Sequence, residues 1–145
     1  KKVKELNSGQ VFYMGCSNNI TTVFAYAGTT AGGSSITNIT QTAVKANEPV
    51  GATWKDIINN NGQVIEYRYT IIAKNTSRQV LDSTYNNVIY VRDTTVSIVP
   101  GFGEIPAAIR HAYYAKGIGL VEVNIEDIAT GSPGSQRKLK SYKIR

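Results

Sequence analysis

The chain has 145 residues, of which 41% are hydrophobic and 18% are charged, and its formal net charge at pH 7 is +6. This length and composition predict one globular β domain over residues 1–145 and exclude extensive disorder. No apolar run approaches the roughly 20 residues that a membrane-spanning helix needs. The first residue is Lys1 rather than Met, which indicates a processed or truncated product with room for an export signal or lipidated cysteine upstream.

The positive charge is concentrated in basic N- and C-terminal tails. Eight of the sixteen basic residues lie there: Lys1, Lys2, Lys4, Arg137, Lys138, Lys140, Lys143 and Arg145. The rest of the chain carries eight basic and ten acidic residues, so the body of the domain is slightly acidic. Such tails suit an anionic lipid surface or another polyanion, and they also act as plain solubilising charge. Nucleic-acid binding is not favoured, because only Arg68 is interleaved with the aromatic residues.

Most of the chain has the composition of β-strands, with β-branched and aromatic residues between Gly, Asn and Pro turns. The predicted strands are residues 10–15, 20–28, 36–46, 64–74, 85–99, 111–127 and 139–145. Turns or loops are predicted at residues 17–19, 29–35, 47–49, 59–62, 82–83, 100–106 and 130–135. Residues 54–59 allow one short turn of helix at most.

The segment 64–74 has the clearest core face among the strands in the middle of the chain. Ile65, Tyr67, Tyr69, Ile71 and Ala73 fall on one side, because side chains of a strand alternate between its two faces. This period of two predicts a strand whose apolar face packs into the core.

The segment 111–127 predicts a strand that bends in the middle. Gly117 and Gly119 flank Ile118, and glycines within a strand pattern mark a bulge or sharp bend. Beyond the bend, one face carries only apolar residues and the other only polar residues. The apolar set is Val121, Val123 and Ile125, and the polar set is Glu122, Asn124 and Glu126. Together these patterns predict an all-β fold, an antiparallel curved sheet forming an open barrel or sandwich with little or no helix.

Four blocks of the chain resemble, in order, a group of uncharacterised exported domains of Gram-negative bacteria that are often described as lipoproteins. The blocks are PVGATW at 49–54, YNNVIYV at 85–91, YYAKGIGLV at 113–121 and LKSY at 139–142. The resemblance runs from about Pro49 to Tyr142, roughly two thirds of the chain. It implies an antiparallel β fold with long curved strands and an extracytoplasmic location, in the periplasm or at the outer membrane. It also implies membrane association through a missing N-terminal anchor, and it transfers no catalytic residues.

Residues that could support catalysis are few. The single histidine, His111, is the only candidate general base near neutral pH, and a structural role for it is favoured. The single cysteine, Cys16, lies in an apolar string and is predicted to be a small buried hydrophobe. One cysteine and one histidine cannot form a zinc site, and the adjacent Glu126 and Asp127 point to opposite faces of a strand. The chain is therefore expected to be no enzyme and to need no metal or cofactor.

The aromatic residues give the remaining indication of function. Six residues are proposed to contact a ligand: Trp54, Tyr67, Tyr69, His111, Tyr113 and Tyr114. Aromatic rings with polar tips on the concave side of a curved sheet suit an amphipathic ligand, although the same rings also suit a packed core. The leading hypothesis is a non-catalytic binding module of the cell envelope with a lipid-like or glycan-like ligand. The alternatives are a structural or protein-interaction domain that offers edge strands or basic tails to an envelope protein, and a small hydrolase centred on His111.

Overall fold

The structure is a computed structural model that describes residues 2–4, 11–29, 35–60, 63–128 and 133–140. Within these ranges every regular element is a β-strand, and all strand pairs are antiparallel, so the predicted all-β antiparallel fold is confirmed. No helix in this part of the chain is long and apolar enough to cross a membrane. The chain divides into two compact units, Lys1–Asn47 and Glu48–Arg145.

The unit Lys1–Asn47 contains a four-stranded sheet. Its strands follow the order β1-β2-β3-β4 and comprise β1 (Lys2–Lys4), β2 (Val11–Ser17), β3 (Ile20–Thr29) and β4 (Ser35–Lys45). Asn18 and Asn19 adopt φ angles of 51° and 60° in the turn between β2 and β3, which confirms the predicted hairpin. Most of the predicted loop at residues 29–35 lies outside the described residues.

Cys16 does not have the buried position that its apolar neighbours predict. Met14 on the same strand is buried, but Cys16 is exposed. It pairs with Thr21 one step from the end of the hairpin, where the edge of the sheet leaves the side chain open to solvent. The prediction of a buried cysteine is therefore wrong.

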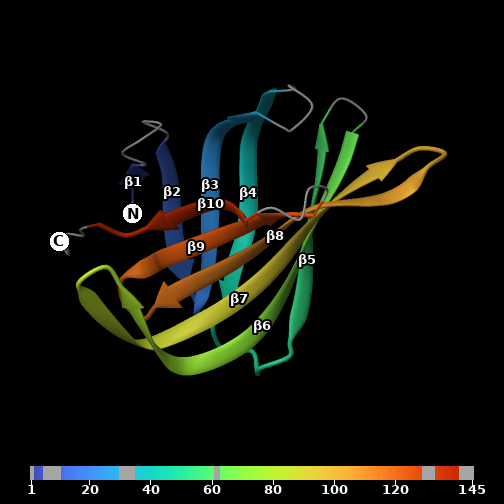
Figure 1. Ribbon diagram of the computed structural model, residues 1–145. Coiled ribbons are helices and arrows are strands. Elements are labelled where there is room, and N and C mark those ends of the chain that lie inside the picture. The colour runs from blue at the N-terminus through green and yellow to red at the C-terminus, as the bar shows by residue number, and fades with distance from the viewer. Residues whose placement is uncertain (1, 5–10, 30–34, 61–62, 129–132, 141–145) are drawn as a thin grey trace. The chain divides into compact units, whose positions relative to one another are not determined.

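The unit Glu48–Arg145 contains a six-stranded sheet in which each strand pairs with its neighbour in sequence (Figure 1). Its strands are β5 (Thr53–Asn60), β6 (Gln63–Val80), β7 (Ser83–Val99), β8 (Gly103–Ala115), β9 (Gly119–Asp127) and β10 (Pro133–Lys138). The spatial order is β10-β9-β8-β7-β6-β5, so this sheet is open rather than closed into a barrel, with β5 and β10 at its edges.

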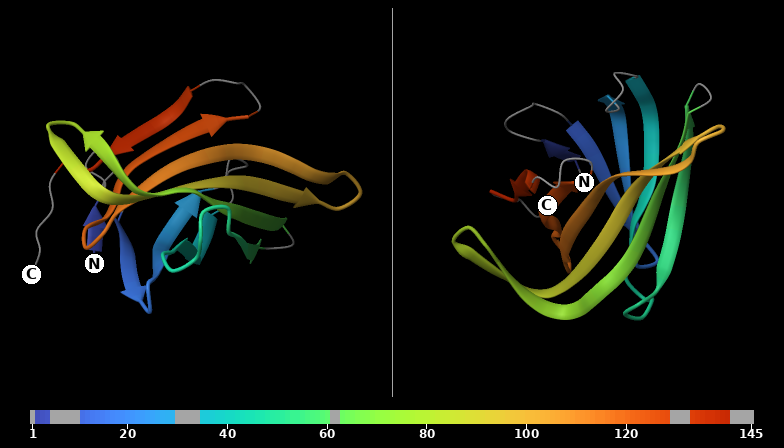
Figure 2. Two further views of the ribbon diagram at one scale, coloured as in Figure 1. Left: turned by 90° about the horizontal axis from the view of Figure 1, so that it is seen from below. Right: turned by 45° about the vertical axis from the view of Figure 1, so that its right-hand side comes forward.

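Strands β6 and β7 are long and curve strongly toward the hairpin that joins them, as Figure 2 shows. Their register shifts three times between Ile71 and Arg78, and Asn75 within this stretch has a φ of 56°. Bulges of this kind bend a strand and increase its twist. The curved ends of β6 and β7 supply Val80, Tyr85 and Val88 to a buried cluster. Ala115 of β8 and Val121 of β9 complete this cluster, with Leu139 packed against it.

Side-chain alternation and register define two faces of the six-stranded sheet. The Tyr69 face carries the side chains of Trp54, Tyr67, Tyr69, Ile71, Val91, Asp93, Arg110, Ala112 and Tyr114. The Arg68 face carries Lys55, Glu66, Arg68, Tyr90, Arg92, His111 and Tyr113. Ile65, Tyr69 and Ile71 are buried, which confirms that the alternating segment of β6 presents a core face.

Two segments form strands where none was predicted, namely β5 and the first residues of β8. Trp54 and its neighbours form β5, because their backbone groups pair with β6, Trp54 lying opposite Tyr69. The prediction of a short helical turn at residues 54–59 is therefore wrong. The predicted loop at residues 100–106 ends early, since β8 begins at Gly103. Pro106 is accommodated because β7 and β8 shift register beside it, and a bulge tolerates the missing N–H.

The segment around Gly117 is a hairpin turn rather than a bend within one strand. β8 ends at Ala115, and Gly117 and Gly119 adopt φ angles of 78° and 107°, so β9 folds back and pairs with β8. Glycine is needed here because side chains disfavour positive φ. Pro133 belongs to β10 instead of a loop, and Leu139 lies just beyond that strand. Residues 61–62, 129–132 and 141–145 of the other predicted turns and strand lie outside the described residues.

Candidate functional site

The six residues predicted to contact a ligand lie on opposite faces of the six-stranded sheet. Four of them share the Tyr69 face: Trp54, Tyr67, Tyr69 and Tyr114. The other two, His111 and Tyr113, lie on the Arg68 face. Adjacent residues of β8 point in opposite directions, so Tyr113 and Tyr114 cannot belong to one surface.

The centre of the Tyr69 face is an ion pair between two neighbouring strands. Asp93 of β7 is paired in register with Arg110 of β8. The Arg110 Nε atom donates to both carboxylate oxygens, at 2.8 Å from Oδ1 and 3.1 Å from Oδ2. The Asp93 side chain is 3% exposed, whereas 29% of the Arg110 side chain remains exposed. The pair therefore anchors the arginine while part of its side chain stays exposed.

Aromatic rings surround this ion pair. The Arg110 Cζ atom lies 5.5 Å from the centre of the Tyr67 ring, a distance at which a cation is attracted by the ring face. Tyr69 stacks on Trp54 with ring centres 5.3 Å apart and an angle of 9° between the planes. Tyr114, four residues after Arg110 on β8, interacts electrostatically with the guanidinium. We call Trp54, Tyr67, Tyr69, Asp93, Arg110 and Tyr114 the Arg110 cluster.

The Arg110 cluster leaves several hydrogen-bonding groups unused. The Tyr69 hydroxyl is buried and has no hydrogen-bond partner within the described residues, and the whole residue is only 2% exposed. The hydrogen bonds of Arg110 involve Nε alone, and the described parts of the chain supply no acceptor for Nη1 or Nη2. A buried hydroxyl without a partner costs about 1 to 3 kcal/mol. Arg110 and Tyr69 therefore hold hydrogen-bond donors that the described residues leave without an acceptor.

Burial sets the protonation state of these groups. It raises the pKa of Tyr67, Tyr69 and Tyr114, because the charged phenolate is poorly solvated inside the protein, although Arg110 partly opposes the effect. The three phenols are thus neutral hydroxyls rather than bases. Burial also raises the pKa of Asp93, and the adjacent Arg110 opposes this shift.

The Arg68 face carries a different arrangement, a continuous row of side chains. Arg78 lies over the Tyr113 ring at 4.0 Å, Tyr113 stacks on Tyr90 with ring centres 4.8 Å apart, and the Tyr90 hydroxyl is 2.6 Å from His111 Nδ1. We call these four residues the Tyr90 row. Both faces of the Tyr113 ring are occupied within the row, so this ring has no free face for a ligand.

The two ends of the Tyr90 row are held by carboxylates of β9. At one end the Arg78 Nε atom donates to Glu122 Oε2 at 2.6 Å, and Gln136 donates to Oε1 of the same carboxylate at 3.1 Å. Glu122 is 3% exposed, although the alternating pattern of β9 predicts it on a polar face. The curved end of β6 covers this side of β9 and supplies the arginine that neutralises the buried charge.

At the other end of the row, both ring nitrogens of His111 face partners. Burial raises the pKa of Tyr90, so its hydroxyl stays protonated, and this hydroxyl is hydrogen-bonded to Nδ1 in a direction that the imidazole tautomer sets. Nε2 lies 3.2 Å from Glu126 Oε1 but makes no hydrogen bond within the described residues. Nδ1 is therefore engaged by Tyr90, and Nε2 is buried. This arrangement disfavours His111 as a general base.

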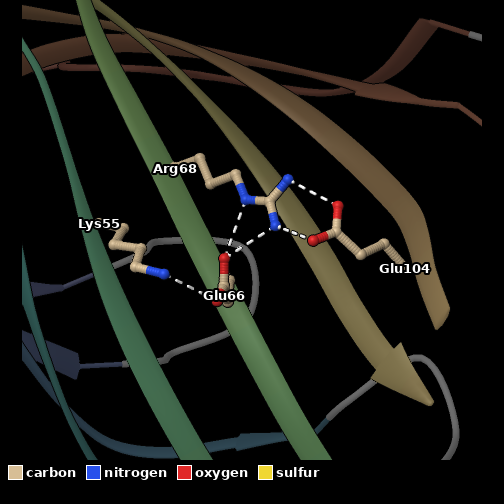
Figure 3. A network of polar contacts seen from close by, with 4 residues as sticks. All are labelled: Lys55, Glu66, Arg68 and Glu104. Carbon is tan, nitrogen blue, oxygen red and sulfur yellow. Dashed lines mark hydrogen bonds and ion pairs between the residues drawn. The ribbon is translucent and has the colours of Figure 1, made fainter. Parts of the chain in front are cut away.

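A separate network of four charges occupies the Arg68 face between β5 and β8 (Figure 3). The guanidinium of Arg68 lies between two carboxylates, 2.9 Å from Glu66 Oε2 and 2.6 Å from Glu104 Oε1. Lys55 donates to the other oxygen of Glu66 at 3.1 Å. Two cations and two anions neutralise one another, so the network leaves no unbalanced charge to attract a ligand.

The described residues hold no metal site, and their open hollow is a weak candidate for binding a ligand. Within the described residues no group of three or more His, Cys, Asp or Glu side chains could hold a metal ion. An open hollow in the first unit is lined by uncharged residues, namely Gly15, Cys16, Ser17, Asn18, Ile20 and Thr22. Neither feature competes with the Arg110 cluster as a candidate site.

The sequence indicated the aromatic members of the Arg110 cluster but not the ion pair at its centre. Asp93 follows Arg92 in β7 and Arg110 precedes His111 in β8, and apart from Glu104 near the start of β8 the other residues of both strands are uncharged. A charge in the middle of such a strand is a usable signal, because an ionised side chain there needs a partner on an adjacent strand.

The comparisons with protein-family models, curated proteins and solved structures found no match for this chain.

Proposed function

We propose that this chain is a non-catalytic binding module of the cell envelope that holds an amphipathic, lipid-like ligand on the Tyr69 face. One observation carries the proposal. Aromatic side chains gather around Arg110, whose Nη1 and Nη2 atoms and the nearby Tyr69 hydroxyl lack hydrogen-bond partners within the described residues. The extracytoplasmic location, in the periplasm or at the outer membrane, and the lipid anchor rest on the resemblance of the sequence blocks.

The chemistry of the cluster supports a ligand with two parts. Partly buried rings such as Tyr67 and Trp54 provide apolar contact for a hydrocarbon portion. The unused donors of Arg110 and Tyr69 suit an oxygen-bearing head group, and binding sites commonly combine an apolar lining with a few convergent polar groups. A glycan is less well suited, since the Tyr69 ring is buried and stacked on Trp54 instead of offering a free face to a sugar.

The same groups give little support to catalysis. The phenols of the cluster are neutral, Asp93 is engaged by Arg110, and His111 on the other face is hydrogen-bonded to Tyr90. A hydrolase needs a nucleophile next to a free general base, and the described residues offer no such pair. These contacts favour binding over the hydrolase alternative.

Native mass spectrometry tests the proposal directly. The protein, exported in a Gram-negative host and purified gently, is expected to carry a dissociable mass beyond that of the polypeptide, or to take up one added dodecyl-chain amphiphile. Tyr69→Phe removes one donor and should weaken this binding about five- to tenfold. Tyr113→Phe, on the opposite face, is the matched control and should bind as the unaltered protein does. Equal weakening by both substitutions, or no uptake of any amphiphile, would contradict the proposal.

A second candidate function is a protein-interaction domain. The sheet of the second unit ends in the edge strand β5, where Ile57 is 55% exposed beside Lys55. Edge strands offer unpaired backbone groups to another chain. The basic tails add a second possible contact surface. A strict monomer in sedimentation velocity, with no envelope protein recovered in pull-down, would count against this function.

A further inference from the structure

The charge around Arg110 is already balanced before any ligand binds. Asp93 neutralises the guanidinium through two hydrogen bonds from Nε and is almost fully buried. The Arg110–Asp93 pair therefore carries no net charge before a ligand arrives.

This balance determines which head group fits. We infer that the ligand of the Arg110 cluster carries an uncharged oxygen head group, such as an ester or alcohol, and that Asp93 selects this group against a carboxylate. The inference deepens the proposed function and rests on it. It goes further by naming the class of ligand and the residue that determines specificity.

The geometry explains the selection. An uncharged oxygen can accept hydrogen bonds from Arg110 Nη1 or Nη2 and from the Tyr69 hydroxyl without adding charge to the face. A carboxylate would bring a second negative charge beside Asp93, and a buried charge without its own counter-ion is strongly disfavoured. Asp93 also occupies Nε, so a carboxylate would have to share the one guanidinium with it.

The first experiment compares two ligands of equal chain length on the unaltered protein. Isothermal titration is performed with 1-monolauroylglycerol and with laurate, below their critical micelle concentrations and at a pH where laurate is ionised. The monoacylglycerol is expected to bind at least about tenfold more tightly, which corresponds to about 1.4 kcal/mol. Equal or tighter binding of laurate would overturn the inference and leave the proposed function intact. Binding of neither ligand would overturn both.

The second experiment assigns the selection to Asp93. Asp93→Asn keeps the size of the side chain and removes its charge, so the preference should shift toward laurate by about tenfold or more. Asp82→Asn, in the exposed turn between β6 and β7, is the matched control and should leave the preference unchanged. Equal loss of affinity for both ligands in Asp93→Asn would mean that Asp93 only supports the structure. If this variant does not fold, the comparison on the unaltered protein decides the inference.

Discussion

Arg110 and Asp93 lie directly opposite each other on β8 and β7, with the Arg110 Nε atom 2.8 Å from Asp93 Oδ1. This cross-strand pair places a guanidinium among the aromatic rings of the Tyr69 face and fixes its orientation through Nε. The two terminal nitrogens take no part in the hydrogen bonds to Asp93. A single pair of residues thus accounts for both the position and the chemistry of the candidate site.

Arg110→Met should destabilise the protein, because it leaves the carboxylate of Asp93 buried without a counter-ion. Breaking a buried ion pair costs about 3 to 5 kcal/mol, and the partial exposure of Arg110 reduces the expected loss to about 2 to 3 kcal/mol. Urea unfolding measures this change. The double variant Arg110→Met with Asp93→Asn should recover part of the loss, since no buried charge remains. A double variant less stable than Arg110→Met alone would refute this account.

Tyr69→Phe should have the opposite effect on the ligand-free protein. The Tyr69 hydroxyl is buried without a partner in the described part of the chain, so its removal should raise the free energy of unfolding by about 1 kcal/mol. Urea unfolding of protein stripped of lipid measures the change. Tyr90→Phe, which loses the hydrogen bond to His111, is the comparison and should lower the stability by a similar amount. A loss of stability in Tyr69→Phe would show that the hydroxyl is satisfied in solution.

Local periodicity was sufficient to predict part of the candidate site. Tyr67 and Tyr69 share a face because they are two residues apart on one strand, and this relationship needs no knowledge of the partner strands. The same reasoning predicted that Ile65 and Ile71 are buried, and the structure confirms it. The prediction of short turns at Asn18 and Asn19 also depended only on local backbone preference.

The register between strands could not be obtained in this way. Arg110 meets Asp93 across 17 residues of sequence, through a turn whose position depends on where β7 ends. Bulges change which face a later residue occupies, and β7 and β8 shift register beside Pro106. Glu122 illustrates the same limit: its alternation predicts a polar face, yet Arg78, 44 residues away, neutralises it in a buried position. Specific pairing of charges depends on contacts that lie far apart in sequence.

Glu122→Gln should destabilise the protein, since it removes the buried charge that Arg78 and Gln136 contact. Replacing a charge-assisted hydrogen bond by a neutral one should cost about 1 to 2 kcal/mol here, because Arg78 remains 35% exposed. Thermal unfolding measures the effect. Glu126→Gln is the matched control on the same strand, and its 57% exposure predicts a change within about 0.5 kcal/mol. Equal effects of the two substitutions would show that the Arg78 contact is not formed in solution.

Acid should lower the free energy of unfolding, because it protonates the carboxylates of the charge network around Arg68. Hydrogen bonds from Arg68 lower the pKa of Glu66 and of Glu104 below their ordinary value of 4.5. The folded state therefore binds fewer protons than the unfolded state in this range. The stabilisation is fully present above pH 4.5 and is lost as the pH falls through the lowered values.

Arg68→Met isolates the contribution of this network. Without the guanidinium, Glu66 and Glu104 should titrate closer to their ordinary range, so the stability of the variant should fall less steeply with acid than that of the unaltered protein. Urea unfolding at a series of pH values measures both curves, and they should converge at the lowest pH at which the protein still folds. High salt should narrow the difference, because Arg68 and Glu104 are 40% and 56% exposed and their attraction is screened by ions. Parallel curves for the two proteins across the acid range would exclude this network as the source of the acid sensitivity.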